Sequence, residues 1–582
     1  MQRRVGLDKE DCSGLRSHSK KEKYTNMKRY ILIILAICAM ATTMAKSPEK
    51  DAVYKLISKS YTLNTDGSTE FRKRTELQIF TRMTFDHFGE TFITYNPDFQ
   101  ELIINEAYTI RKDGSKVETP ANAFNPMLPD GCTKCERLNG IRTMVVTHTA
   151  LEYDATIVLD YTIRSKNFFF QELLEKVDLQ EEVPVEKYVV SVTTPDYKPA
   201  KFQLNGENLS YTTTESKNKD FVTTVYTFNN LPEQPTDECL FPSATASLTL
   251  FTMDIVDNLI GKISQQNSMQ KFDNQKIMDF FHSRFTEGMS DMDKILYVRD
   301  YIHDNIRTNN LNAKVLDYMF ASPQQVWESN CALPVEKNIL LAGVLKGLGY
   351  DAQQVFITET LTKNPTTMVY VKVGELYYYI SANEAEDMSL DVLHDNISFI
   401  GLDGQQWAEE KIDINVAVDA DIIFESGKLD NPQVVVKRKN VQSPKTKTLR
   451  PQEISVAKAY VTPLTGKYYE LSFDDGNYGT QIQSVNIHND RQYDINTGQS
   501  DEKYSYTITL PSNVRSLTKP MHKEITVENA KLLIDVQVDG QTVTINRQLS
   551  LPAEGISAKS VKKFKAMMGE WEAPVKIVFS TL

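Results

Sequence analysis

The chain has 582 residues, too many for a single hydrophobic core, and this length predicts roughly three or four domains. Apolar residues make up 41% and charged residues 24% of the chain, which is typical of a folded soluble protein. The formal net charge is −12 and no basic stripe runs along the sequence, so a nucleic-acid partner is not expected.

The first 45 residues predict a cleaved secretory signal peptide, with translation expected to begin at Met27 rather than at Met1. Lys28 and Arg29 supply a basic start, and the small residues after position 38 suit cleavage. The apolar run between them, residues 30–40, is too short to span a bilayer comfortably. We therefore expect an exported protein with no membrane span after cleavage; a single membrane anchor is the alternative.

Removing residues 1–45 changes both the charge and the cysteine count. The remaining chain has 56 basic and 73 acidic residues, a net charge of −17. Its cysteines are Cys132, Cys135, Cys239 and Cys331, too few for a disulfide scaffold. The domains are therefore expected to be stabilised by their hydrophobic cores.

Residues 46–250 have the alternation that is typical of β-strands. Phe71, Leu77 and Ile79 fall on one face of a predicted strand, which follows a turn at Asp66-Gly67. Helical periodicity is almost absent from this stretch. The pattern predicts one or two antiparallel β-sandwich units.

Residues 265–400 change to an α+β pattern. Two amphipathic helices are predicted at Met292–Ile306 and Val335–Leu348. Three strands follow at Asp351–Thr358, Thr367–Val373 and Glu375–Ile380. Helices followed by a short antiparallel sheet indicate a separate α+β domain.

Residues 412–582 return to strands and form a predicted C-terminal β domain. The basic, polar stretch Val436–Lys447 predicts a linker, and Ser557–Trp571 predicts a terminal helix with one apolar face. The chain as a whole is thus expected to be multidomain.

The segment before the second predicted helix is the one that could carry a nucleophile, Cys331. A catalytic cysteine needs a lowered pKa, often from a helix N-terminus, and an imidazole that accepts its proton. A third group must orient that imidazole. Cys331 precedes a helix, which meets the first requirement, but no histidine occurs between Cys331 and His394.

Residues 290–382 resemble a transglutaminase-like domain, which implies a papain-like α+β core. The matching residues are Asn330-Cys331, Lys337, Leu340-Leu341, Leu345-Lys346-Gly347-Leu348-Gly349 and Ala352. The β-rich stretch before them resembles the domain of unknown function that precedes such cores in Gram-negative envelope proteins. That likeness rests on Asp66-Gly67-Ser68, Ala107 and Asp113-Gly114-Ser115-Lys116-Val117.

The catalytic residues of the family do not carry over to this sequence. Its histidine position corresponds to Met368 and its aspartate position to Ser381. The cysteine position is contested between Cys331 and Pro334, since the family's spacing back from Leu348-Gly349 reaches the proline. Loss of base and orienting group would cost several orders of magnitude in rate.

Three interpretations of Cys331 stay open. It is a small buried residue in a retained fold, a nucleophile with a displaced base such as His394 or His303, or one half of a disulfide. Cys132 and Cys135 form a CxxC pair in a loop, for which a local disulfide is predicted in an oxidising compartment. Zinc binding would need ligands recruited from Cys239 or His148, and no metal or other cofactor is expected.

The sequence thus predicts a β-sandwich region (46–250), a transglutaminase-like core (265–400) and a C-terminal β domain (412–582). The resemblance implies a periplasmic, outer-membrane or cell-surface protein. Its core would be a pseudoenzyme, a scaffold or a module that binds a peptide, glycan or envelope protein. The alternative is an active cysteine amidase, peptidase or acyl-transfer enzyme that uses Cys331.

Overall fold

A computed structural model describes residues 50–581, except 168, 207–208, 255–257, 270–271, 273, 385–396, 410–413, 425–433, 443–458, 474–478, 481 and 574. The predicted signal peptide and His394 lie outside the described residues. The described chain is mostly β-structure, with helices concentrated in the middle and one helix near the C-terminus.

An eight-stranded sheet, ordered β12-β13-β10-β1-β2-β8-β4-β5, dominates the N-terminal part. Its strands are β1 (Ala52–Leu63), β2 (Thr69–Ile79), β4 (Gln100–Ile110), β5 (Lys116–Glu118), β8 (Thr156–Ser165), β10 (Val185–Pro195), β12 (Tyr211–Asn218) and β13 (Phe221–Leu231). The expectation of purely antiparallel pairing was wrong at one place, because β1 pairs with β10 in parallel. A parallel neighbour needs a long crossover, and the intervening strands β2 to β9 provide it.

Two smaller sheets cover one face of this large sheet. They are β3 (Glu90–Tyr95), β7 (Arg142–Thr147) and β6 (Phe124–Met127), and β11 (Lys201–Asn205), β14 (Ser247–Phe251) and β9 (Leu174–Asp178). Ile93 of β3 packs in one cluster with Leu159 of β8, and Leu248 of β14 packs in another with Ile57 of β1. The short helix α2 (Met83–Phe88) lies at the edge of this layered structure.

The middle of the chain contains five α-helices and a five-stranded sheet among its described residues. The helices are α3 (Ile260–Ser264), α4 (Gln275–His282), α5 (Asp291–Asn305), α6 (Pro323–Ser329) and α7 (Pro334–Gly347). The sheet, ordered β19-β18-β17-β20-β21, contains β17 (Ala352–Ile357), β18 (Thr367–Val373), β19 (Leu376–Ile380), β20 (Ile397–Gly401) and β21 (Gln406–Glu409). Two short strands, β15 (Arg307–Thr308) and β16 (Cys331–Ala332), pair in parallel beside them.

The helix α7 lies at the centre of this part of the chain. Pro334 occupies its first turn, where a missing N–H costs nothing. Leu340, Leu341 and Val344 are fully buried and pack against α5 and the sheet. The predicted helices 292–306 and 335–348 are confirmed as α5 and α7, each within one residue at both ends.

The C-terminal part contains a six-stranded and a four-stranded sheet. The first, ordered β23-β22-β26-β30-β29-β28, is made of β22 (Ile414–Phe424), β23 (Val434–Gln442), β26 (Ser500–Thr509), β28 (Met521–Val527), β29 (Ala530–Asp539) and β30 (Thr542–Leu551). The second is made of β24 (Ala459–Pro463), β25 (Tyr468–Phe473), β31 (Val575–Thr581) and β27 (Val514–Ser516). Helix α8 (Val561–Glu572) buries Phe564, Met567 and Met568 in the core that the two sheets share.

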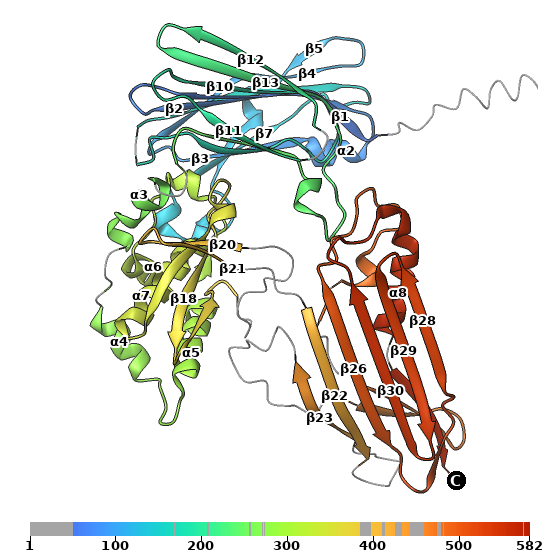
Figure 1. The fold of residues 1–582 in the computed structure, drawn as a ribbon. Helices are drawn as coiled ribbons and strands as arrows, with labels where there is room; N and C mark the ends of the chain where they lie inside the picture. Colours follow the sequence, from blue (N-terminus) through green and yellow to red (C-terminus); the bar gives the residue numbers. More distant parts are fainter. Residues whose placement is uncertain are drawn as a thin grey trace, which may run out of the picture.

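The three parts form a branched arrangement. The N-terminal sheets lie across the top, and the helical part and the C-terminal sheets lie side by side beneath them (Figure 1). The segment around Cys239 joins the first part to the third, because Asn496 N–H donates to the Cys239 carbonyl at 2.7 Å. None of the described helices combines the length and the apolar character that crossing a bilayer requires.

Candidate functional site

The N-terminus of α7 is the place where the family resemblance would put a catalytic thiol, and a carboxylate occupies it. Glu336 is fully buried, and its oxygens accept hydrogen bonds from the backbone N–H groups of Leu333 and Ala321, both at 2.7 Å. A negative charge suits the first turn of a helix, where the dipole and free N–H groups stabilise it. A side chain of the helix itself therefore already places a negative charge at the helix N-terminus.

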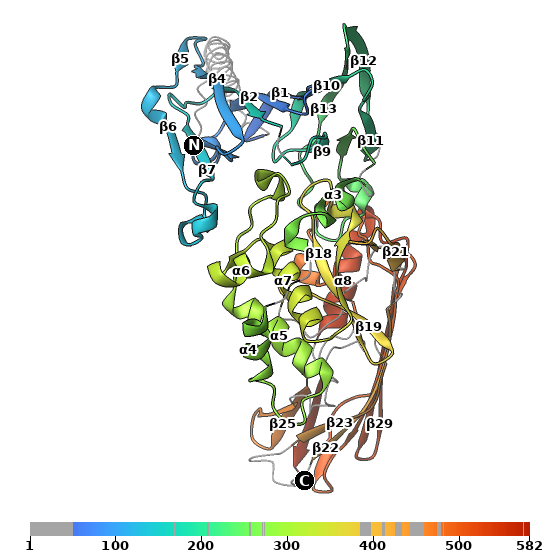
Figure 2. The ribbon, with the colours of Figure 1, turned by 90° about the vertical axis from the view of Figure 1, so that its left-hand side faces the viewer.

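Arg137 provides the counter-charge for this carboxylate from the N-terminal part of the chain. Its Nη2 lies 2.6 Å from Glu336 Oε2, and its side chain is about one-fifth exposed, at 21%. Arg137 belongs to residues 128–141, which we name the cysteine loop. The loop hangs below β6 and β7 and points toward the helical part (Figure 2).

The same loop is joined to the helical part by a disulfide between Cys135 and Cys331. Their Cα atoms are 5.8 Å apart, although 196 positions separate them in the sequence. The predicted local disulfide between Cys132 and Cys135 was wrong. The turn at Cys132–Lys134 directs Cys135 toward β16, where Cys331 is fully buried in the same apolar cluster.

Cys132 remains a thiol and lies in this cluster as well. Its side chain is fully buried, and Asn309 Nδ2 donates a hydrogen bond to its Sγ at 3.2 Å. Burial raises the pKa of the Cys132 thiol, while the Asn309 hydrogen bond and the charge of Arg137 lower it. Cys331, by contrast, is both buried and disulfide-bonded, so two of its three interpretations hold at the same time.

A buried polar cluster joins α7 to the two strands that would carry the base and the orienting group. Asn338 Nδ2 donates to the Thr367 carbonyl at 2.6 Å and to Ser381 Oγ at 3.2 Å. Its Oδ1 accepts from Ala382 N–H at 2.8 Å. Asn338 is fully buried, and none of these side chains titrates in the usual pH range.

Met368 lies on the other face of the sheet. It packs with Val355, Tyr379 and Phe399, whereas Val369 and Val371 face α7. Because side chains alternate along a strand, a base at position 368 would point away from the helix. Thr367, its neighbour, is the residue of β18 whose side chain lies beside Asn338, at 3.3 Å. Ser381, at the family's aspartate position, lies next to α7, where Asn338 donates to its Oγ.

Besides Arg137, two basic side chains lie near the start of α7, Lys337 and His303. Lys337 is 2% exposed, and its Nζ donates to the backbone carbonyl of His303 at 3.2 Å. Burial lowers the pKa of Lys337 to about 8. The His303 ring lies on α5 with its Nδ1 2.9 Å from Asp304 Oδ1, in a partly exposed position.

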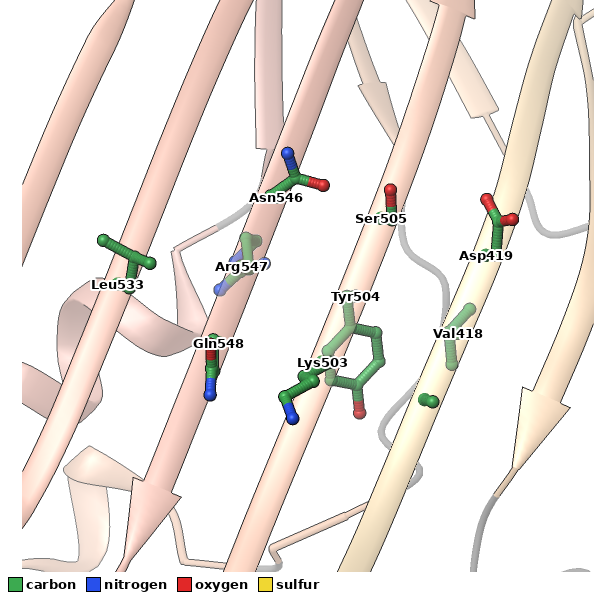
Figure 3. A pocket seen from close by; sticks show the side chains of 10 residues that line it. Val418, Asp419, Lys503, Tyr504, Ser505, Leu533, Asn546, Arg547 and Gln548 are labelled. Atoms are coloured by element: carbon green, nitrogen blue, oxygen red, sulfur yellow. The ribbon is translucent and has the colours of Figure 1, made fainter.

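Of the hollows that lie away from the disulfide, two lie beside α7 and on the C-terminal sheet. One of about 260 Å³ runs along α7 and is lined by Ile339, Ala342, Lys346 and Gln354. The other, of about 360 Å³, lies on the C-terminal sheet between Asp419, Tyr504 and Arg547 (Figure 3). Within the described part of the chain, no three His, Cys, Asp or Glu side chains gather in a way that could hold a metal ion.

Sequence reasoning found Cys331 and Ser381 but missed Arg137, Glu336 and Asn338. Glu336 follows Leu333, which lacks the hydroxyl of a capping box, so no capping pattern pointed to it. Arg137 reaches the site from a distant loop, and its sequence context carries no signal of that contact. Asn338 is an uncharged polar residue directly before the apolar run Ile339 to Leu341, which was the available signal.

Comparison with known families finds two matched stretches. Residues 65–235 match the family described as "Domain of Unknown Function with solved-structure structure (DUF3857)", and residues 472–577 match its counterpart, DUF3858. The expected likeness of the N-terminal β-rich stretch to a domain of unknown function is thereby confirmed. Neither match extends into residues 265–400. No curated protein matches the chain.

One solved structure extends the comparison to 91% of the chain. The chain is similar to the crystal structure of "a putative protease from Parabacteroides distasonis", with 23% identity and a TM-score of 0.68. That likeness covers 91% of this chain and 99% of the other, and it establishes a shared fold. A "putative cysteine protease from Cytophaga hutchinsonii" has 11% identity over 37% of this chain and 76% of its own, with a TM-score of only 0.18.

Proposed function

We propose that this is an exported envelope protein whose transglutaminase-like core no longer performs thiol catalysis. The core would act as a scaffold or as a binding module for a peptide, glycan or envelope protein. One observation carries the proposal: the sulfur of Cys331 is bonded to Cys135 and buried, so it offers no free thiolate. A disulfide-bonded sulfur cannot attack a carbonyl carbon.

The surroundings of Cys331 support the same conclusion. Glu336, which is paired with Arg137, already occupies the N-terminus of α7. The positive end of the helix dipole therefore stabilises this carboxylate and not a thiolate. Thr367 of β18 and Ser381, directly after β19, stand where base and orienting group would be expected, and both accept hydrogen bonds from an amide. Neither can take a proton from a thiol at neutral pH.

Export is supported by the predicted signal peptide and by the Cys135–Cys331 disulfide, which persists in oxidising compartments. The periplasm, the outer membrane and the cell surface all meet this condition. The hollow along α7 offers space for a small apolar group with a cationic rim at Lys346.

The test measures turnover with and without reductant. Full-length protein is incubated with a glutamine-containing peptide and a primary amine, and ammonia release and peptide cleavage are followed. We expect no turnover above that of a Cys331→Ala variant in either condition. Turnover that appears after reduction and disappears in Cys331→Ala would overturn the proposal. Iodoacetamide labelling of the native chain should modify the half-buried Cys239 and leave Cys331 unlabelled.

The second candidate is an amidase, peptidase or acyl-transfer enzyme in which a reduced Cys331 acts with His303 or His394 as base. Two observations favour it. The first is the shared fold with a structure described as a "putative protease". The second is that β15 directly follows α5, the helix that contains His303, and pairs with β16, the strand that contains Cys331. The reductant arm of the same assay decides between the two candidates.

A further inference from the structure

A third sulfur lies beside the Cys135–Cys331 disulfide. Cys132 shares a fully buried apolar cluster with both disulfide partners. Asn309 holds it there: its Nδ2 donates to Cys132 Sγ at 3.2 Å, and its backbone N–H donates to the Ala332 carbonyl at 2.8 Å. The residue that fixes the Cys132 sulfur is therefore also bonded to the neighbour of Cys331.

The backbone of the cysteine loop also allows Cys132 to bond to Cys135. Cys135 N–H donates to the Cys132 carbonyl at 2.9 Å, closing a tight turn. In such a turn the first and fourth Cα atoms lie within about 7 Å of each other. A disulfide spans Cα distances of about 4.4–6.8 Å. Cys135 thus lies within reach of two sulfurs, one in its own loop and one in β16.

We propose that Cys132, Cys135 and Cys331 form an internal thiol–disulfide exchange site. Cys132 loses its proton to solvent, and its thiolate attacks Cys135 Sγ. The Cys132–Cys135 bond forms as the Cys135–Cys331 bond breaks, and Cys331 leaves as a thiolate that takes up a proton. The number of disulfides is unchanged, so the step needs neither an oxidant nor a reductant.

The exchange would release the cysteine loop from β16 and produce a free thiol just before α7. It goes beyond the proposed function and does not restore catalysis, because Thr367 and Ser381 still provide no base for the freed Cys331 thiol. The attacking group must be a thiolate, and burial raises the pKa of Cys132. The charged group that acts on it is Arg137 of the same loop, which lowers the pKa of Cys132 and is itself paired with Glu336 of α7. The exchange should therefore be faster at pH 9 than at pH 7.

Disulfide mapping of the full chain tests this. Protein purified without reductant is held at pH 7 or pH 9, quenched with acid, denatured, and alkylated with N-ethylmaleimide below pH 6.5. Trypsin cuts after Lys134, between the two loop cysteines, so each linkage joins different peptides. At pH 9 we expect peptide 117–134 linked to 135–137, with alkylated Cys331 in peptide 315–337, at several times the level found at pH 7.

A Cys132→Ser variant is the matched control and should keep only the link between Cys135 and Cys331. A Cys331→Ser variant tests the same geometry from the other side and should form the Cys132–Cys135 bond. Wild-type protein that retains the Cys135–Cys331 bond and an alkylated Cys132 at both pH values would overturn the proposal. Two free thiols at Cys132 and Cys135 in Cys331→Ser would also overturn it.

Discussion

Lys337, close to the candidate site, is buried, whereas a lysine ordinarily has its ammonium group in solvent. Its side chain is 2% exposed, and the His303 carbonyl at 3.2 Å accepts a hydrogen bond from its ammonium group. A backbone carbonyl compensates only part of the cost of burying a charge. The structure therefore keeps this charge at a cost to stability, which a pH titration can detect.

We predict that Lys337→Met stabilises the protein by about 1–2 kcal/mol at pH 7, because methionine has a volume similar to that of lysine and carries no charge. The pKa of Lys337 is about 8 in the folded chain, below its ordinary value of 10.5. Between these values the unfolded chain binds more protons, so the free energy of unfolding of the wild type rises with pH. Urea unfolding at pH 7 and pH 9.5 should show that this rise is lost in the variant.

The exposed Lys346 of the same helix provides the control. Lys346→Met should leave both the stability at pH 7 and its pH dependence close to wild type. A Lys337→Met variant with the pH dependence of the wild type would contradict the burial argument.

At the residue scale, the sequence predicted which side chains are unusual better than it predicted their partners. Cys331 was recognised as chemically suspect and as a candidate for burial, and it is fully buried. The partner of Cys135 was missed, because nearness in sequence favoured Cys132 while the fold brings β16 closer. The spacing of cysteines in the sequence shows which local disulfides are possible, but it carries no information about a loop that packs against a distant strand.

The ion pair between Arg137 and Glu336 is a property of the helix α7, since it satisfies the start of that helix. We predict that Glu336→Gln destabilises the protein by about 3–5 kcal/mol, because it leaves Arg137 without a counter-charge in a largely buried place. Arg137→Met should cost less, since two backbone N–H groups still compensate the carboxylate. The double variant should lose less than the sum of the single variants, and urea unfolding measures all three.

Lys363 and Asp178 form a matched control for this pair. They also bridge the N-terminal and helical parts, but their side chains are 64% and 51% exposed. Lys363→Met is expected to change stability by less than about 1 kcal/mol. Additive effects of Glu336→Gln and Arg137→Met would show that the two side chains do not depend on each other.

At the element scale, the spacing of apolar residues predicted the bounds of several elements well, including α7, which is buried on nearly all sides and not on one face alone. The helices α5 and α7 and the strand β18 were located closely from apolar spacing alone. The predicted linker 436–447 was wrong over its first part, because β23 extends to Gln442 and pairs with β22. A lysine- and arginine-rich edge strand resembles a linker in composition. The face of Met368 was missed for a different reason. A shift of one residue in the alignment reverses the face on which every side chain of a strand lies.

At the scale of the whole molecule, the order of β-rich, helical and β-rich stretches was evident in the sequence, but their contacts were not. Phe169 and Phe170 N–H groups donate to Asp317 Oδ2 at 2.5 and 2.9 Å. Arg491 Nη2 donates to the Glu238 carbonyl at 3.1 Å, across 253 positions. Such contacts depend on how finished parts pack, which no local pattern encodes. The cysteine loop and Asp317 are two of the places that fasten the helical part to the N-terminal sheets, beside ion pairs such as Lys363–Asp178.

These two places should respond differently when the disulfide is removed. A Cys135→Ala/Cys331→Ala variant loses a cross-link over 196 positions, which the chain-entropy model values at about 5 kcal/mol and experiment more often at about 2–4 kcal/mol. Hydrogen exchange followed by mass spectrometry should show faster exchange in the cysteine loop and in β15 and β16. Peptides that contain Phe169, Phe170 and Asp317 should keep their protection, because their hydrogen bonds do not depend on the disulfide.

Cys239→Ala, remote from the loop, should change neither region. Equal loss of protection at both places would mean that the disulfide holds both of them. Unchanged exchange in the loop would mean that the Arg137–Glu336 pair and the apolar cluster suffice to hold the loop.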